Sequence, residues 1–202
     1  MGCKPSAFPI EQGLKLDKGE SELRVNASQY RRLIGRLLYL QATRPDITYS
    51  INILSQFVAD PRNNHLEAAN RVLGYLKVTL GQGILISRAG DPVLTAYCDS
   101  DWLGCPYTRR SRTGYMLLLG ETPISWKTKK QSLVSRSSAE AEYRAMASTV
   151  SEIIWVRWLL SELHVHNPLA TPLFCDNQAA RHIANNPVFH ERTKHVEILL
   201  CT

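Results

Sequence analysis

Between residues 28 and 80, apolar residues recur every three or four positions, which is the spacing of amphipathic helices. The spacing predicts three consecutive helices, over about 28–41, 45–58 and 64–78. Pro45 lies near the first position of the second helix, and Asp60–Arg62 ends it. Residues 1–27 mix prolines, glycines and charges without periodicity, so we expect an extended lead-in there.

After Gly83 the pattern changes to short apolar runs between turn residues, and these runs predict strands over about 84–87, 93–98, 114–119 and 123–127. A long helix should follow over about 138–163, capped by Ser137 or Ser138. Its predicted buried stripe consists of Tyr143, Met146, Ala147, Val150 and Ile154. Beyond it we expect a strand over 173–175 and helices over 177–185 and 194–200.

This order of elements predicts an α/β fold in which antiparallel hairpins come first and a later strand joins the sheet in parallel through a crossover. The change of pattern across residues 81–92 sets the expected boundary between a helical part, 1–85, and an α/β part, 86–202.

Acidic residues follow two of the predicted strands directly. Asp99 and Asp101 come after one apolar run and point to the same face, and Asp176 comes after another. Such a pair is either the solvated end of a strand or part of a cation site, because unpaired carboxylates are costly to bury. If the two strands are neighbours, Asp99 and Asp176 should converge at one edge of the sheet.

The long helix carries two further acids near its start, Glu140 and Glu142. At about 100° per residue they point roughly 200° apart, so only one of them can face the sheet edge. The periodicity does not choose between them. Either one is also a favourable acid at a helix N-terminus without any other role.

The chain has 24 Lys and Arg against 18 Asp and Glu, and its formal charge of +6 suits a polyanionic partner without proving one. Seven basic residues concentrate around the predicted hairpin and could follow a phosphate backbone: Arg109, Arg110, Arg112, Lys127, Lys129, Lys130 and Arg136. The alternative for each is a solvated surface position.

The five cysteines form no CxxC pair and the first residues form no apolar signal segment, so we expect an intracellular protein of the cytoplasm or nucleus. No apolar run is long enough for a membrane span, and no membrane role is expected. Cys98 and Cys175 are expected to be small buried hydrophobes. His190 and His195, with Cys175 and Cys201, match no zinc-site spacing.

Five motifs, in this order along the chain, resemble the ribonuclease H domain of copia-type retrotransposon polyproteins: Ala96–Trp102, Arg112–Tyr115, Ser125–Lys127, Ser135–Tyr143 and Cys175–Ala180. Three upstream motifs are similar to the C-terminal end of the reverse transcriptase of the same polyproteins: Tyr30–Gly35, Thr43–Asp46 and Arg71–Lys77.

The resemblance implies a ribonuclease H-like mixed sheet flanked by helices, preceded by a small helical segment. It implies hydrolysis of the RNA strand of RNA:DNA hybrids, with two Mg²⁺ or Mn²⁺ ions held by Asp99, Glu142 and Asp176 as catalytic and metal-binding residues. The implied partners are the hybrid and the reverse transcriptase and integrase parts of a parent polyprotein.

The family pattern continues past residue 197 into a strand and a helix with a fourth aspartate, whereas this sequence ends at Thr202. The resemblance therefore predicts a weakened metal site. Glu197 is a candidate replacement for this fourth acid, but it belongs to a different helix of the family layout. The alternative to a nuclease is a catalytically dead nucleic-acid-binding fragment of a mobile element. An unstable relic, or another nuclease or strand-transfer enzyme of this architecture, would also fit.

Overall fold

The computed structural model describes residues 3–14, 16–17, 23–87, 91–165 and 169–185. The chain divides into two compact units, residues 1–84 and 85–202. The helix expected over 194–200 lies outside the described residues, as do Glu197, His190, His195 and Cys201.

The first unit is built from the three predicted helices, α1 (Ala27–Leu40), α2 (Thr48–Leu54) and α3 (Asn63–Val78). Short 3₁₀ turns, Pro45–Ile47 and Ser55–Phe57, flank α2. The Asn26 side chain accepts the N–H groups of Ser28 and Gln29, so α1 begins before the predicted start. The core of this unit includes the fully buried Tyr30, Ile34, Ile47, Ile51, Leu54 and Val72.

One helical glycine of this unit is needed for a close backbone approach. The Ser6 N–H donates to the Gly74 carbonyl oxygen at 3.3 Å, which joins the N-terminal segment to α3. A Cβ at Gly74 would collide with the Lys4 carbonyl oxygen, so a side chain at this position would push the segment away.

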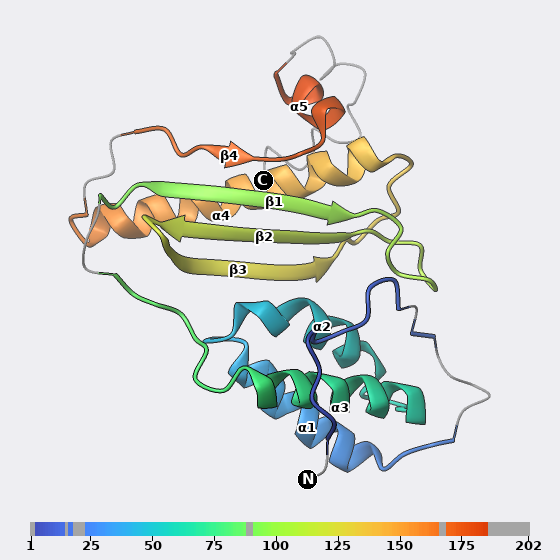
Figure 1. The fold of residues 1–202 in the computed structure, drawn as a ribbon. Helices are drawn as coiled ribbons and strands as arrows, with labels where there is room; N and C mark the ends of the chain where they lie inside the picture. The colour runs from blue at the N-terminus through green and yellow to red at the C-terminus, as the bar shows by residue number, and fades with distance from the viewer. Residues whose placement is uncertain (1–2, 15, 18–22, 88–90, 166–168, 186–202) are drawn as a thin grey trace. The chain divides into compact units, whose positions relative to one another are not determined.

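The second unit contains a four-stranded sheet of β1 (Leu94–Asp101), β2 (Arg112–Leu119), β3 (Thr122–Lys130) and β4 (Leu173–Phe174). The order is β3-β2-β1-β4 (Figure 1). The first three strands pair antiparallel, and β4 pairs parallel to β1 through Ala96–Leu173 and Tyr97–Phe174. Helix α4 (Ser138–Glu162) runs along one face of the sheet, and α5 (Gln178–Asn185) follows β4. This arrangement confirms the predicted fold class, a mixed α/β sheet flanked by helices.

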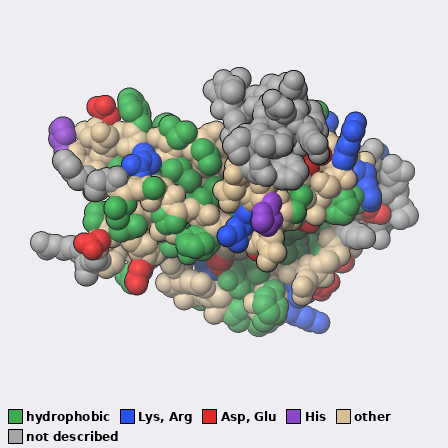
Figure 2. Space-filling view, turned by 90° about the horizontal axis from the view of Figure 1, so that it is seen from above, with side chains coloured by type: hydrophobic (Ala, Val, Ile, Leu, Met, Phe, Trp, Pro, Cys, Tyr) green, Lys and Arg blue, Asp and Glu red, His purple; other side chains and the backbone are tan. Residues whose placement is uncertain are grey.

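The core of the second unit lies between α4 and the sheet, where Ile153, Val156 and Leu160 of the helix pack on Leu94 and Leu117. The predicted stripe is wrong at Ile154, whose side chain is 63% exposed. The reason is that the second half of α4 is apolar on nearly every side, so its periodicity does not single out one face. Figure 2 shows hydrophobic side chains gathered at the end of the unit where α4 ends.

The strand expected over 84–87 does not form. Leu85 and Ile86 are 82% and 81% exposed, so neither side chain packs against the sheet. The segment contacts β3 through the Thr122 hydroxyl, which accepts the Ser87 N–H and donates to the Leu85 carbonyl.

Within the described parts of the chain, no helix has the length and apolar character that a membrane crossing requires.

Candidate metal and nucleic-acid site

Three elements bring acidic side chains to one edge of the sheet. Because β1 and β4 are parallel neighbours in register, the residues that follow Tyr97 and Phe174 emerge side by side. The first turns of α4 reach the same edge, since Glu142 accepts the backbone N–H of Ser100 in β1 at 3.0 Å. Ser137 begins the helix by accepting the Glu140 N–H, which confirms one of the two predicted caps.

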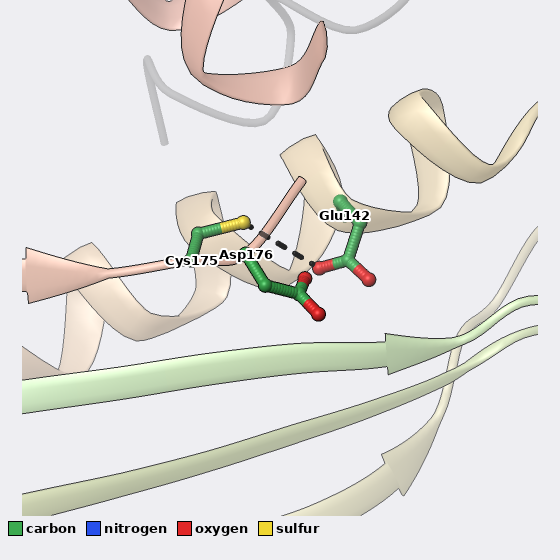
Figure 3. Close-up of side chains that lie close together, drawn as sticks. All are labelled: Glu142, Cys175 and Asp176. Carbon is green, nitrogen blue, oxygen red and sulfur yellow. Dashed lines mark hydrogen bonds between the residues drawn. The ribbon is translucent and has the colours of Figure 1, made fainter. Parts of the chain in front are cut away.

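Glu142, Cys175 and Asp176 form a compact group of potential metal ligands. One ligand atom of each lies within 4.8 Å of those of the other two, and the Cys175 thiol donates to Glu142 Oε2 at 3.7 Å (Figure 3). Glu142 is only 5% exposed, whereas Cys175 is half-buried and Asp176 is exposed. The group is therefore anchored in the protein on one side and open to solvent on the other.

The electrostatics of the group oppose a second negative charge. The pKa of Glu142 is raised to about 7, mainly because the side chain is buried and partly because of the negative charges of Asp99 and Asp176, while the hydrogen bond from the Ser100 N–H acts in the opposite direction. A cation between the carboxylates would remove the conflict, because it would favour the ionised form of each.

The third predicted ligand, Asp99, lies beside this group rather than within it. Asp99 is exposed and points to the same face of β1 as Tyr97, whose ring stacks on Phe174 with 5.2 Å between centroids. Its carboxylate is not among the ligand atoms that the described residues bring within 4.8 Å. Its charge nevertheless acts on Glu142, so the two side chains share one electrostatic environment.

The geometry separates the two candidate glutamates of α4. Glu142 points to the sheet edge, whereas Glu140 accepts the Arg136 N–H at 2.8 Å and pairs with the Arg144 guanidinium at 3.0 Å. Glu140 thus holds the start of the helix, and Glu142 joins Asp176.

The predicted basic residues do not all reach the surface. Arg112 is only 4% exposed and is not available to a ligand, whereas the other six are exposed or half-buried. Lys129 and Lys130 line a pocket of about 310 Å³ together with Arg144. Sequence reasoning did not single out Arg144, because an arginine four residues after Glu140 reads as an ordinary helix ion pair.

A positioning residue was also missed, since Gln131 follows β3 without any motif that marks it. Its amide nitrogen donates to the Ala141 carbonyl at 2.9 Å and to the Thr113 hydroxyl at 3.1 Å, and its oxygen accepts the Ser135 hydroxyl at 3.1 Å. Gln131 therefore ties the first turn of α4 to β2. Cys175 was expected to be only a small buried hydrophobe. Its position directly before Asp176 was the sequence signal that it could lie among the potential metal ligands.

Similar proteins are found among transposon polyproteins. The chain is 43% identical over 196 residues to the "Retrovirus-related Pol polyprotein from transposon RE1" of Arabidopsis thaliana, which is 97% of this chain and 13% of that protein. It is 42% identical to the RE2 polyprotein of the same plant, over 97% of this chain and 14% of that protein. It is 35% identical to the "Retrovirus-related Pol polyprotein from transposon TNT 1-94" of Nicotiana tabacum, over 97% of this chain and 15% of that protein. No family model and no solved structure matches the chain.

Proposed function

The chain is homologous over nearly its whole length to one segment of retrovirus-related Pol polyproteins from plant transposons, and on that premise we propose that it is a ribonuclease H. The proposed reaction is metal-dependent hydrolysis of the RNA strand of RNA:DNA hybrids. In this assignment residues 86–202 are the nuclease part and residues 1–85 correspond to the end of a reverse transcriptase. The observation that supports the proposal is the approach of Glu142 in helix α4 to Asp176, which follows β4, beside Asp99 in the neighbouring parallel strand β1.

The donor set fits a hard divalent cation. Asp99, Glu142 and Asp176 offer carboxylate oxygens, which are the ligands that Mg²⁺ and Mn²⁺ prefer. When bound, such ions activate water and stabilise the leaving oxygen of a phosphodiester. The protein contributes the positions of these groups, because the Ser100 N–H fixes Glu142 and the Gln131 amide fixes the turn of helix that carries it.

The basic residues support a polyanionic substrate. Lys129 and Lys130 line one pocket, in which the buried Arg144 is paired with Glu140, and Arg109, Arg110, Lys127 and Arg136 are exposed elsewhere in the same unit. Contacts of this kind bind phosphates without reading base sequence, and they weaken as salt rises. We therefore assign them to the backbone of the hybrid.

Cleavage of a labelled RNA:DNA hybrid by the purified chain, with Mg²⁺ or Mn²⁺, tests the proposal. Asp176→Asn and Asp99→Asn should abolish cleavage, because each removes a ligand charge. Glu121→Gln is a matched control, since Glu121 is an exposed acid in the turn between β2 and β3, at the other end of the sheet. Cleavage that is equal in the wild type and Asp176→Asn would refute the proposal.

The same experiment distinguishes a nuclease from the alternative function, a protein that binds nucleic acid without cleaving it. Salt-dependent binding of the hybrid without cleavage above the Asp176→Asn level would favour a catalytically dead nucleic-acid-binding fragment of a mobile element. Duplex DNA of the same sequence should be compared, because a fold does not fix the substrate.

A further inference from the structure

The Cys175 thiol has no place in a site made only of oxygen ligands. Mg²⁺ and Mn²⁺ are bound through oxygen, whereas a thiolate selects softer ions, of which Zn²⁺ is a common one in proteins. Yet Cys175 Sγ lies 3.7 Å from Glu142 Oε2 and within the same 4.8 Å group as Asp176. A thiol and two carboxylates that face one another form a mixed sulfur and oxygen ligand set (Figure 3).

The separation of Cys175 Sγ from Glu142 Oε2 fits a tetrahedral ion. Zinc binds sulfur at about 2.3 Å and carboxylate oxygen at about 2.1 Å, so two such ligands at the tetrahedral angle lie about 3.6 Å apart. The observed separation of sulfur and oxygen is 3.7 Å. Little movement of Glu142 or Cys175 would be needed, and the exposed Asp176 is free to adjust because solvent surrounds it.

We propose that Glu142, Cys175 and Asp176 form a Zn²⁺ site, with one oxygen from each carboxylate, the Cys175 sulfur and a water as the fourth ligand. The thiol proton, which points to Glu142 in the free protein, passes to solvent when the sulfur coordinates the metal. Three protein ligands with an open fourth position are typical of accessible rather than structural zinc sites.

A regulatory consequence rests on the proposed nuclease function, whereas the zinc site itself does not. Glu142 and Asp176 cannot serve a zinc ion and a catalytic Mg²⁺ ion in the same way at the same time. Zn²⁺ should therefore inhibit Mg²⁺-dependent cleavage.

Titration of the metal-free, reduced chain with Co²⁺ tests the site, because tetrahedral Co²⁺ bound to a thiolate gives a charge-transfer absorption band. The wild type should show a band that saturates at one Co²⁺ per chain and disappears when Zn²⁺ displaces the cobalt. Cys175→Ser should lack the band. Cys105→Ser is the matched control, since Cys105 is a buried cysteine of the same unit with Lys130 at 3.6 Å from its sulfur, and it should keep the band.

Two further measurements keep the result independent of folding and of catalysis. Circular dichroism must show that each variant is folded, and Zn²⁺ should raise the melting temperature of the wild type but not of Cys175→Ser. A band of equal strength in Cys175→Ser, or no band in the folded wild type, would overturn the zinc site. Inhibition is measured for each variant as the ratio of cleavage with and without Zn²⁺. The cobalt titration measures metal binding alone, so it decides the question of the zinc site even if the chain has no nuclease activity.

Discussion

Replacement of Glu142 by glutamine should stabilise the second unit at neutral pH when divalent ions are removed. Burial holds the pKa of Glu142 at about 7 in the folded chain, against 4.5 as its ordinary value. The native state therefore binds a proton that the unfolded state releases between these two pH values. Stability falls as pH rises through this window and stays low above it.

The magnitude follows from the size of the window. A difference of about 2.5 pH units, at 1.36 kcal/mol per unit, corresponds to roughly 3 kcal/mol. Glutamine keeps the carbonyl oxygen that accepts the Ser100 N–H and carries no charge. The Glu142→Gln variant should thus match the wild type near pH 4.5 and exceed it by about 3 kcal/mol above pH 7.

Urea unfolding at several pH values between 4.5 and 8, with a chelator present, measures this difference. Glu121→Gln serves as the control, because Glu121 is exposed and should show no such trend. Addition of Mg²⁺ should stabilise the wild type and not Glu142→Gln, so the gap should narrow. A gap that does not change with pH, or a variant less stable than the wild type at pH 8, would refute the reasoning.

Gly74→Ala should destabilise the first unit, because the new Cβ collides with the Lys4 carbonyl. Gly35→Ala should stabilise α1 by about 1 kcal/mol, because its Cβ meets nothing within 4 Å. Urea unfolding in which both midpoints move in the same direction would contradict this. Tyr30→Phe should cost about 1–2 kcal/mol in the same assay, since its buried hydroxyl donates to a backbone carbonyl at the end of α2 at 2.9 Å. Gln131→Ala should cost a similar amount and also lower hybrid cleavage, because the first turn of α4 loses its tie to β2; cleavage at the wild-type level would argue against the positioning role.

Much of the fold follows from periodicity and chain breakers. The helices of the first unit were predicted because Pro45, Pro61 and the glycines after α3 interrupt strongly periodic runs, and the hairpins of the second because short apolar runs alternate with turn residues. The expected strand over 84–87 failed because short apolar runs carry too little information to distinguish a strand from an exposed connection. The sequence did not predict that β1 and β4 are neighbours; it predicted only that Asp99 and Asp176 converge if they are. Strand pairing is decided by tertiary contacts, which the local pattern does not contain.

The candidate site was predicted less completely. Periodicity left Glu140 and Glu142 equivalent, and only the resemblance chose Glu142, which the structure places against Asp176. Arg112 is buried and Cys175 joins the group of potential ligands because of the side of the sheet to which each side chain points. That side is set by the pairing register of the strands, which becomes known only when the sheet is assembled.

Among the strands that the structure describes, the nine-residue β3 forms one edge of the sheet, and long unpaired edges tend to recruit strands from other molecules. Lys127, Lys129 and Lys130 lie on this strand, and charged side chains of this kind are a common protection against such aggregation. The charges that we assign to substrate binding would therefore also keep separate copies of the protein apart. A variant that lacks all three lysines should self-associate, so the contribution of these residues to substrate binding is best measured one at a time.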